Sequence, residues 1–255
     1  MTNSTLINEN HIVLITGGNS GIGRALVEFY SEKKSIVYSL DLHHHDQDEG
    51  IDSQVRKITC DVTDEDAMSA VINEISAQVP YISTLLVNAG IVPNWSDTAN
   101  LDITLFEKVL RINVLGAVIT LKLAAPLMKR PGGSIIFTGS LNSWKGDPNI
   151  ASYVASKHAI FGVVKSAALD LGRDGIRVNA VAPGPIATQA LTDRVAKRCA
   201  DDLTAIDQTF EKLRSVTALQ RIATVGEVVS AIDFLASENS SGITGQLINV
   251  DCGVL

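Results

Sequence analysis

Short apolar segments alternate with longer amphipathic segments along most of the chain. The short segments are rich in β-branched residues and lack strict polar alternation, as expected of strands covered on both faces. They span residues 11–16, 35–40, 84–87, 134–138, 176–181 and 246–250. The longer segments have helical spacing and span residues 23–33, 65–78, 104–129, 152–173 and 226–236. This alternation predicts an α/β fold, a doubly wound parallel sheet of about seven strands with helices on both faces.

The organisation along the chain indicates a single domain over residues 1–255, because no linker, repeat or low-complexity segment divides it. Residues 190–215 interrupt the alternation with a cluster of charges. We expect either a solvated pair of helices there or a mobile lid over the substrate. His43, His44 and His45 are expected to form an exposed loop, since no further ligand lies near them in the sequence, and no metal site is predicted.

Composition narrows the class of protein. Hydrophobic residues make up 45% of the chain and charged residues 19%, which is typical of a globular protein. The net charge of -7, without a basic patch, argues against a nucleic-acid partner. Three cysteines far apart predict neither a disulfide framework nor a metal site. The polar first ten residues lack a secretory pattern, and apolar runs are interrupted by charges, so we expect a cytoplasmic protein without a membrane partner.

A glycine-rich loop follows the first predicted strand and opens the first helix, with Gly17, Gly21 and Gly23 in the spacing G-x-x-x-G-x-G. Glycine lets the backbone turn tightly and lets a pyrophosphate approach the helix N-terminus. The spacing differs from the common G-x-G-x-x-G pattern, so the glycines alone are a moderate signal. They indicate a dinucleotide site.

The end of the second strand indicates which dinucleotide binds. Asp41 lies about twenty residues beyond the glycines, where a carboxylate binds both ribose hydroxyls and repels a 2′-phosphate. Neither Asn19, Ser20 nor the positions just after Asp41 hold an arginine or lysine. The sequence therefore predicts NAD rather than NADP.

A second motif carries proton chemistry. Tyr153 and Lys157 are four residues apart at the start of a predicted helix, so they share one face. A nearby ammonium group and an oxidised nicotinamide would both favour the phenolate. Tyr153 could then act as general acid in ketone reduction and general base in alcohol oxidation. Ser140, thirteen residues earlier at the end of a strand, can stabilise charge on a substrate oxygen, and Ser143 is its rival for this role.

Together these motifs resemble the short-chain dehydrogenase/reductase family in its single-domain branch, which has a Rossmann-type fold. The resemblance runs from His11 to the C-terminus. It is carried by TGGNSGIG at 16–23, CDVT at 60–63, NAG at 88–90, RINVLGA at 111–117, Ser140, YVASK at 153–157 and VNAVAPGPIAT at 178–188.

The resemblance implies a set of cofactor-binding positions. Those present in this sequence are Gly17, Asn19, Ser20, Gly21, Ile22, Gly23, Asp41, Asp61, Val62, Asn88, Ala89, Gly90, Tyr153, Lys157, Pro183, Gly184, Ile186 and Thr188. Asp61 and Val62 would contact the adenine, residues 88–90 the adenosine side, and Ile186 and Thr188 the nicotinamide carboxamide.

The resemblance also implies a catalytic set of Asn113, Ser140, Tyr153 and Lys157. Lys157 would bind the nicotinamide ribose, and Asn113 would hold a water that links Lys157 to solvent. The family's spacing favours Ser140 over Ser143. Many relatives have serine where this chain has Gly139, and we expect the glycine to enlarge the pocket beside the nicotinamide.

The substrate would bind beyond the carboxyl ends of the strands. Candidate substrate-binding residues are Ser140, Tyr153, Trp95, Asn142, Trp144 and Gln189. Flat apolar walls with amide groups would suit a small cyclic or hydroxylated molecule, although both tryptophans could equally be ordinary surface or subunit-contact residues.

Two classes of function remain open. The first is an oxidoreductase that transfers a hydride between NAD(H) and a secondary alcohol or ketone, with an NADPH-dependent 3-oxoacyl reductase as a variant. The second is a catalytically silent dinucleotide-binding regulatory protein. Helices 104–129 and 152–173 carry apolar residues on more than one face, and family members bury these helices between subunits, so we expect a homotetramer.

Overall fold

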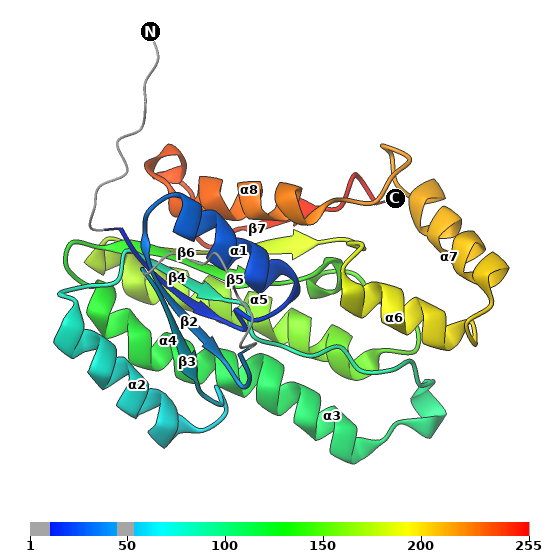
Figure 1. The fold of residues 1–255 in the computed structure, drawn as a ribbon, viewed down its shortest axis with the longest axis horizontal. Helices are drawn as coiled ribbons and strands as arrows, with labels where there is room; N and C mark the ends of the chain where they lie inside the picture. Colours follow the sequence, from blue (N-terminus) through cyan, green and yellow to red (C-terminus); the bar gives the residue numbers. More distant parts are fainter. Residues whose placement is uncertain (1–10, 45–53, 255) are drawn as a thin grey trace, which may run out of the picture.

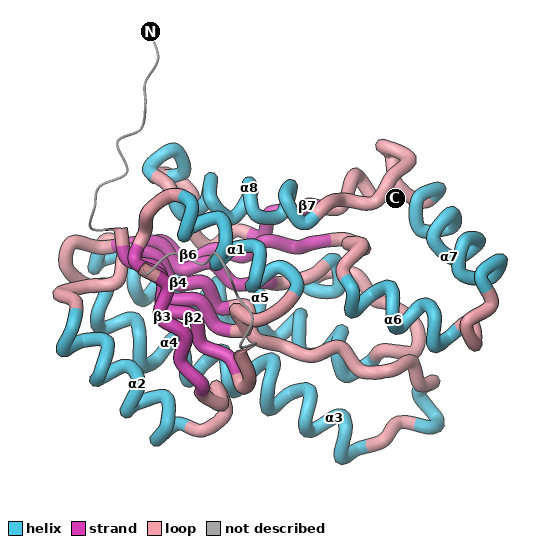
Figure 2. Tube along the Cα trace, viewed as in Figure 1, coloured by secondary structure: helices cyan, strands magenta, loops and turns pink. Residues whose placement is uncertain are grey.

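Residues 11–44 and 54–254 are described by the computed structural model, and they form one twisted parallel sheet between two layers of helices (Figures 1 and 2). The described strands are β1 (Ile12–Thr16), β2 (Ile36–Asp41), β3 (Val55–Thr59), β4 (Thr84–Val87), β5 (Gly133–Thr138), β6 (Ile176–Pro183) and β7 (Leu247–Val250). All pair in parallel, in the order β3-β2-β1-β4-β5-β6-β7. The predicted doubly wound α/β fold is confirmed.

The edge strand β3 was not located by the apolar pattern. Its sequence, VRKIT, carries Arg56 and Lys57, and none of its residues is fully buried. An edge strand has a neighbour on one side only and tolerates polar residues, so it lacks the continuous apolar signal of the central strands.

Helices cover both faces of the sheet. On one face, α1 (Gly21–Glu32) and α8 (Val225–Ala236) pack together, and their side chains join those of β1 in an apolar cluster. On the other face lie α2 (Glu65–Gln78), α4 (Ala117–Ala124) and α5 (Ala151–Leu171), whose buried residues include Met68, Ile119 and Ile160. Both faces of the central strands are therefore buried, which explains their unbroken apolar sequences.

The expected long helix over residues 104–129 is divided. It consists of α3 (Ile103–Leu110), a π-helical segment (Arg111–Gly116), α4, and a 3-10 turn (Ala125–Met128). An 18-residue window of the run Ile103–Met128 has a mean hydropathy of 1.5, so its length and composition would permit a membrane crossing. In the fold, however, the run packs against α2 and α5, and the π-helical segment places Asn113 in the protein interior.

The charged segment between β6 and α8 forms the predicted pair of helices, α6 (Gln189–Arg198) and α7 (Leu203–Ser215), which extend beyond the sheet (Figure 1). Val195 is the buried residue of α6, and α7 has none. The two ends of the segment meet, because Ile186 pairs with Ala223 in a parallel bridge. The segment is thus anchored at its base and lightly packed beyond it.

The histidine loop and the cysteines show no metal or disulfide chemistry in the described part of the chain. His43 is exposed, His44 Nε2 lies 3.0 Å from the Ile58 carbonyl oxygen, and His45 lies outside the described residues. Cys60, Cys199 and Cys252 are unpaired. Among the described residues, no group of three potential metal ligands comes together.

Candidate active site

A cavity of about 870 Å³ runs along the carboxyl ends of the strands, where ligands bind in sheets of this topology. Most of the sequence-predicted site residues line it. The four that do not are Asn19, Gly23, Asn113 and Trp144. The cavity therefore joins the predicted dinucleotide site to the predicted catalytic residues.

The glycine loop exposes backbone without side chains to the cavity. Gly17 has a φ of +71°, and a Cβ atom there would lie 2.8 Å from the Ala89 Cα atom. A Cβ atom on Gly23 would overlap the Gly17 carbonyl oxygen. Gly21 has a φ of +53° and open space around it. Neither a side-chain cap at Ser20 nor an acidic residue in the first turn occupies the N-terminus of α1, so its amide groups suit a phosphate.

Asp41 stands where β2 ends, beside this loop. Its Oδ2 atom accepts a 2.9 Å hydrogen bond from the Asn19 amide, so Asn19 supports the carboxylate rather than lining the cavity. Its Oδ1 atom accepts a long, 3.5 Å hydrogen bond from the His43 amide, and Asp41 lines the cavity together with the following residue, Leu42. This position suits the hydroxyls of an adenosine ribose.

The predicted adenine end contains Asp61 and Val62, both in the cavity lining. Sequence reasoning missed Lys108 and Arg111, which line the same cavity from the end of α3. Arg111 donates a 3.4 Å hydrogen bond to the Thr63 carbonyl oxygen. The helical spacing of Lys108 and Arg111 indicated only an exposed helix face, so nothing in the sequence placed them at the cavity.

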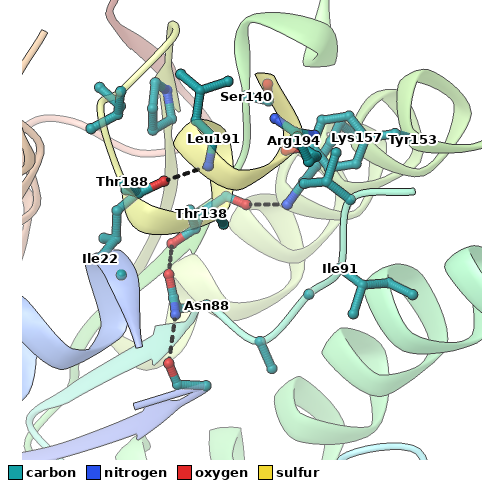
Figure 3. Close-up of a pocket in the computed structure, with 18 of the residues that line it drawn as sticks. Ile22, Asn88, Ile91, Thr138, Ser140, Tyr153, Lys157, Thr188, Leu191 and Arg194 are labelled. Carbon is teal, nitrogen blue, oxygen red and sulfur yellow. Dashed lines mark hydrogen bonds between the residues drawn. The ribbon is translucent and has the colours of Figure 1, made fainter. Parts of the chain in front are cut away.

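A series of hydrogen bonds links the glycine loop to Lys157 (Figure 3). Asn88 Nδ2 donates to the Gly17 carbonyl oxygen at 3.1 Å, and Thr138 Oγ1 donates to Asn88 Oδ1 at 3.0 Å. Lys157 Nζ donates to the Thr138 carbonyl oxygen at 2.7 Å. Asn88, Ala89 and Gly90 also line the cavity. Thr138, which sequence reasoning missed, fixes both ends of the site relative to one another.

Asn113 lies behind the cavity wall. Its Oδ1 atom accepts from the Ile91 amide at 2.8 Å, and its Nδ2 atom donates to the Ile91 carbonyl oxygen and to Ser156 Oγ at 2.9 and 3.1 Å. Both amide hydrogens are thus used by protein groups. The contacts give Asn113 a positioning role between the loop after β4 and helix α5, and its water-holding role stays a prediction.

The two rival serines face different ways. Ser140 lines the cavity, and its Oγ atom is within 3.3 Å of Asn142 Oδ1. Ser143 Oγ accepts from the Ser140 amide at 3.1 Å and does not line the cavity. This geometry favours Ser140. Gly139 lines the cavity, and a Cβ atom there would meet the Val181 carbonyl oxygen at 2.8 Å, so a side chain would require this part of the wall to shift. The larger pocket beside the nicotinamide stays a prediction.

Tyr153 and Lys157 occupy the first turns of α5 and both line the cavity. Lys157 Nζ lies 5.5 Å from the centre of the Tyr153 ring. Burial raises the pKa of Tyr153, while the hydrogen bond with Ser140 and the charge of Arg194 act in the opposite direction. Burial lowers the pKa of Lys157 to about 8. Both groups can therefore respond strongly to charge introduced by a ligand.

The strand end after β6 closes the cavity from the other side. Pro183, Gly184, Ile186 and Thr188 all line it. Thr188 is the N-cap of α6, and its hydroxyl accepts from the Leu191 amide at 3.4 Å (Figure 3). The hydroxyl hydrogen is left available for a carboxamide oxygen.

The predicted substrate residues divide into two groups. Trp95, Asn142 and Gln189 line the cavity with Ser140 and Tyr153. Trp144 does not, and 47% of it is exposed. Nothing in the spacing of Trp144 from Ser140 revealed which way the short turn would direct it.

Charged residues in the same part of the cavity were not predicted. Arg194 and Arg198 of α6 place their guanidinium groups 5.6 and 4.6 Å from the centre of the Trp95 ring, and Asp147 lines the same region. The i, i+4 spacing of the two arginines was the available signal, because it places them on one face of the helix.

Comparisons with known proteins agree with this geometry. Residues 17–255 match the protein family described as enoyl-(acyl carrier protein) reductase. The (-)-isopiperitenol/(-)-carveol dehydrogenase of Mentha piperita is 32% identical over 252 residues, covering 95% of this chain and 92% of that protein.

Two solved structures extend the comparison. A structure of NAD⁺-bound xylitol dehydrogenase has a TM-score of 0.89 at 27% identity, over 96% of this chain and 100% of that one. A structure of ElxO with NADP bound has a TM-score of 0.86 at 28% identity, over 95% and 98%. The chain belongs to the short-chain dehydrogenase/reductase family of oxidoreductases.

Proposed function

We propose that this protein transfers a hydride between NAD(H) and a secondary alcohol or ketone. One observation carries the proposal: Ser140, Tyr153 and Lys157 converge on the same cavity that Asp41 and the glycine loop line at its other end. A nicotinamide dinucleotide bound along this cavity would supply the group that accepts or donates the hydride.

The residues present fit such a cofactor. The uncapped N-terminus of α1 would hold the pyrophosphate, and Asp41 would bind the ribose hydroxyls beside it. A 2′-phosphate would meet the carboxylate of Asp41, and neither Asn19 nor Ser20 provides a compensating cation. This supports NAD over NADP, although solved structures similar to the chain include both cofactors.

Proton transfer falls to Tyr153. Its hydroxyl would give a proton to the ketone oxygen in reduction and take one from the alcohol in oxidation. Ser140 would hold the same oxygen and stabilise its developing charge. Lys157 would keep its ammonium beside the Tyr153 ring, favouring the phenolate, and would bind the nicotinamide ribose. The substrates named for the carveol and xylitol dehydrogenases are alcohols, which supports this reaction class.

The matched pair Tyr153→Phe and Tyr81→Phe tests the mechanism. Both variants lose one phenolic hydroxyl, and Tyr81 does not line the cavity. We expect Tyr153→Phe to lose at least about a hundredfold in kcat, the usual contribution of a general acid or base, while NADH still binds by fluorescence titration. Tyr81→Phe should retain activity. Substantial turnover by Tyr153→Phe across a range of pH would refute the mechanism.

A regulatory protein without activity is the competing function. A regulatory protein would need no intact proton-transfer group. This chain retains Ser140, Tyr153 and Lys157 in one cavity, which favours the enzyme. A screen of secondary alcohols and ketones with both cofactors decides between them, because a silent protein would bind NADH and turn over none.

A further inference from the structure

Arg194 brings a positive charge to the catalytic end of the cavity. It lies on α6, lines the cavity, and is drawn beside Ser140 and Tyr153 in Figure 3. Its charge acts on the Tyr153 hydroxyl, and the hydroxyl acts on it in return. The guanidinium is therefore close to the point at which a substrate oxygen would exchange its proton.

The bonding of this guanidinium is incomplete. The Arg194 Nε atom is buried, and the described residues provide it with no hydrogen-bond partner. One side of the group faces the Trp95 ring. Arg194 as a whole is half-buried, but buried polar atoms such as its Nε are normally paired, and leaving one unpaired is costly. Nε and the adjacent amino group form the planar fork that matches a carboxylate.

Charges nearby leave the region positive. The Asp147 carboxylate interacts electrostatically with Arg194, Arg198 and Lys145, so three cations surround this one anionic group. Asp147 would attract a cationic substrate, but the two arginines outweigh it. It would also repel a doubly charged phosphate more than a singly charged carboxylate. The balance of charges favours a monoanion.

The cofactor does not account for Arg194. Phosphate groups belong at the N-terminus of α1 and the glycine loop, whereas Arg194 lies with Trp95, Asp147 and Tyr153. Arg194 is also not needed to promote proton transfer, because Lys157 already supplies a cation beside Tyr153. The substrate is the remaining occupant of this position.

We propose that the substrate is a hydroxy acid or its oxo acid, whose carboxylate binds Arg194 within a few bonds of the carbon that reacts at Tyr153. This inference rests on the proposed function. In the oxidative direction, the carbinol hydrogen leaves as hydride to NAD⁺, the hydroxyl proton passes to Tyr153, and the products are the oxo acid and NADH. Arg194 keeps its proton and pairs with the carboxylate throughout.

Matched acids and esters test the proposal. We would measure kcat/KM for racemic lactate and 3-hydroxybutyrate against their methyl esters, with racemic glycerol 3-phosphate as the phosphate arm. The wild type should prefer at least one acid over its ester by roughly tenfold to a hundredfold, as expected for a charge-assisted pair out of water. Arg194→Gln should abolish this preference, mainly through KM, and Arg194→Lys should restore part of it.

Two control variants distinguish an effect of the position of Arg194 from an effect of the protein's net charge. Lys197→Gln removes one positive charge from an exposed position of the same helix, outside the cavity lining. Arg198→Gln removes the neighbouring guanidinium one turn away. We expect the acid-to-ester ratio to change less than about threefold in Lys197→Gln, and less in Arg198→Gln than in Arg194→Gln.

A binding measurement keeps this inference distinct from the proposed function. The protein with NADH is titrated with oxamate and malonamate and with the neutral diamides oxamide and malonamide, using NADH fluorescence. Tighter binding of at least one anion, lost in Arg194→Gln, supports the inference even without turnover. Tyr153-dependent turnover of neutral alcohols with no preference for acids or anions would overturn it and leave the proposed function intact. Preference for glycerol 3-phosphate over both acids would also overturn it.

Discussion

Lys157 should make the free protein less stable than it would be with an apolar side chain. The lysine is 6% exposed, and burial lowers its pKa from 10.5 to about 8. The difference corresponds to about 3 kcal/mol of unfavourable free energy for keeping the ammonium charged in the folded state, at about 1.4 kcal/mol per pKa unit. Substitution of Lys157 also removes its hydrogen bond to the Thr138 carbonyl oxygen. This loss costs about 1–3 kcal/mol and offsets part of the gain in stability.

The sign of the pH dependence follows from the lowered pKa. Below pH 8 the lysine is protonated in both folded and unfolded states, so the full cost is present. Between pH 8 and 10.5 the unfolded chain binds more protons, and stability rises with pH. The stabilising effect of Lys157→Met should thus be smaller at pH 9.5 than at pH 7, by about 2 kcal/mol.

Urea unfolding of wild type and Lys157→Met at pH 7 and pH 9.5, at one protein concentration, measures this difference. Comparing the two proteins cancels the titration of all other groups. The variant should be inactive, because Lys157 is also a proposed catalytic residue. A stability difference that does not change with pH, or that grows as the pH rises, would refute the reasoning.

Three further predictions concern cofactor, assembly and motion. Asp41→Ala should lower the preference for NAD(H) over NADP(H) by at least about tenfold in kcat/KM, since it removes both the ribose bonds and the repulsion; a wild type that uses NADP(H) equally well would contradict the assignment. Light scattering should give the mass of a homotetramer, because Leu115 and Leu169 are 44% and 85% exposed on the helices expected to pair; a stable monomer at micromolar concentration would exclude it. Hydrogen exchange in residues 190–215 should slow when NADH and a substrate analogue bind, because few of their side chains are buried; slow exchange in the free protein, unchanged by ligand, would show a rigid helix pair instead.

The parts of the fold that the sequence predicted are those with a strict local requirement. The turn at Gly17 needs a positive φ and no side chain, and central strands buried on both faces need unbroken apolar residues. The spacing of Tyr153 and Lys157 fixes a shared helix face. Each of these leaves a pattern in the residues themselves, so the fold and the placement of Tyr153 and Lys157 together on one cavity could be predicted.

The features that escaped prediction depend on tertiary packing. Edge strand β3 has a neighbour on one side only, and the π-helical break around Asn113 hardly alters the apolar periodicity. The orientation of the Trp144 side chain depends on a three-residue turn. The close contact of the Gly139 backbone with β6 depends on how that strand packs. Arg194 looked like part of a solvated charge cluster, because only the docking of α6 on the cavity distinguishes its inner face.

The bridge between Ile186 and Ala223 has a consequence for how this scaffold can diversify. It fastens both ends of the segment that carries α6 and α7, so the register of β6 and the start of α8 are set independently of the sequence between them. Once a loop is closed, doubling its length costs only about 0.6 kcal/mol more. The segment can therefore vary in length and sequence at little cost to β6 and α8, and the cavity residues that it carries, Thr188 and Arg194 among them, would change with it.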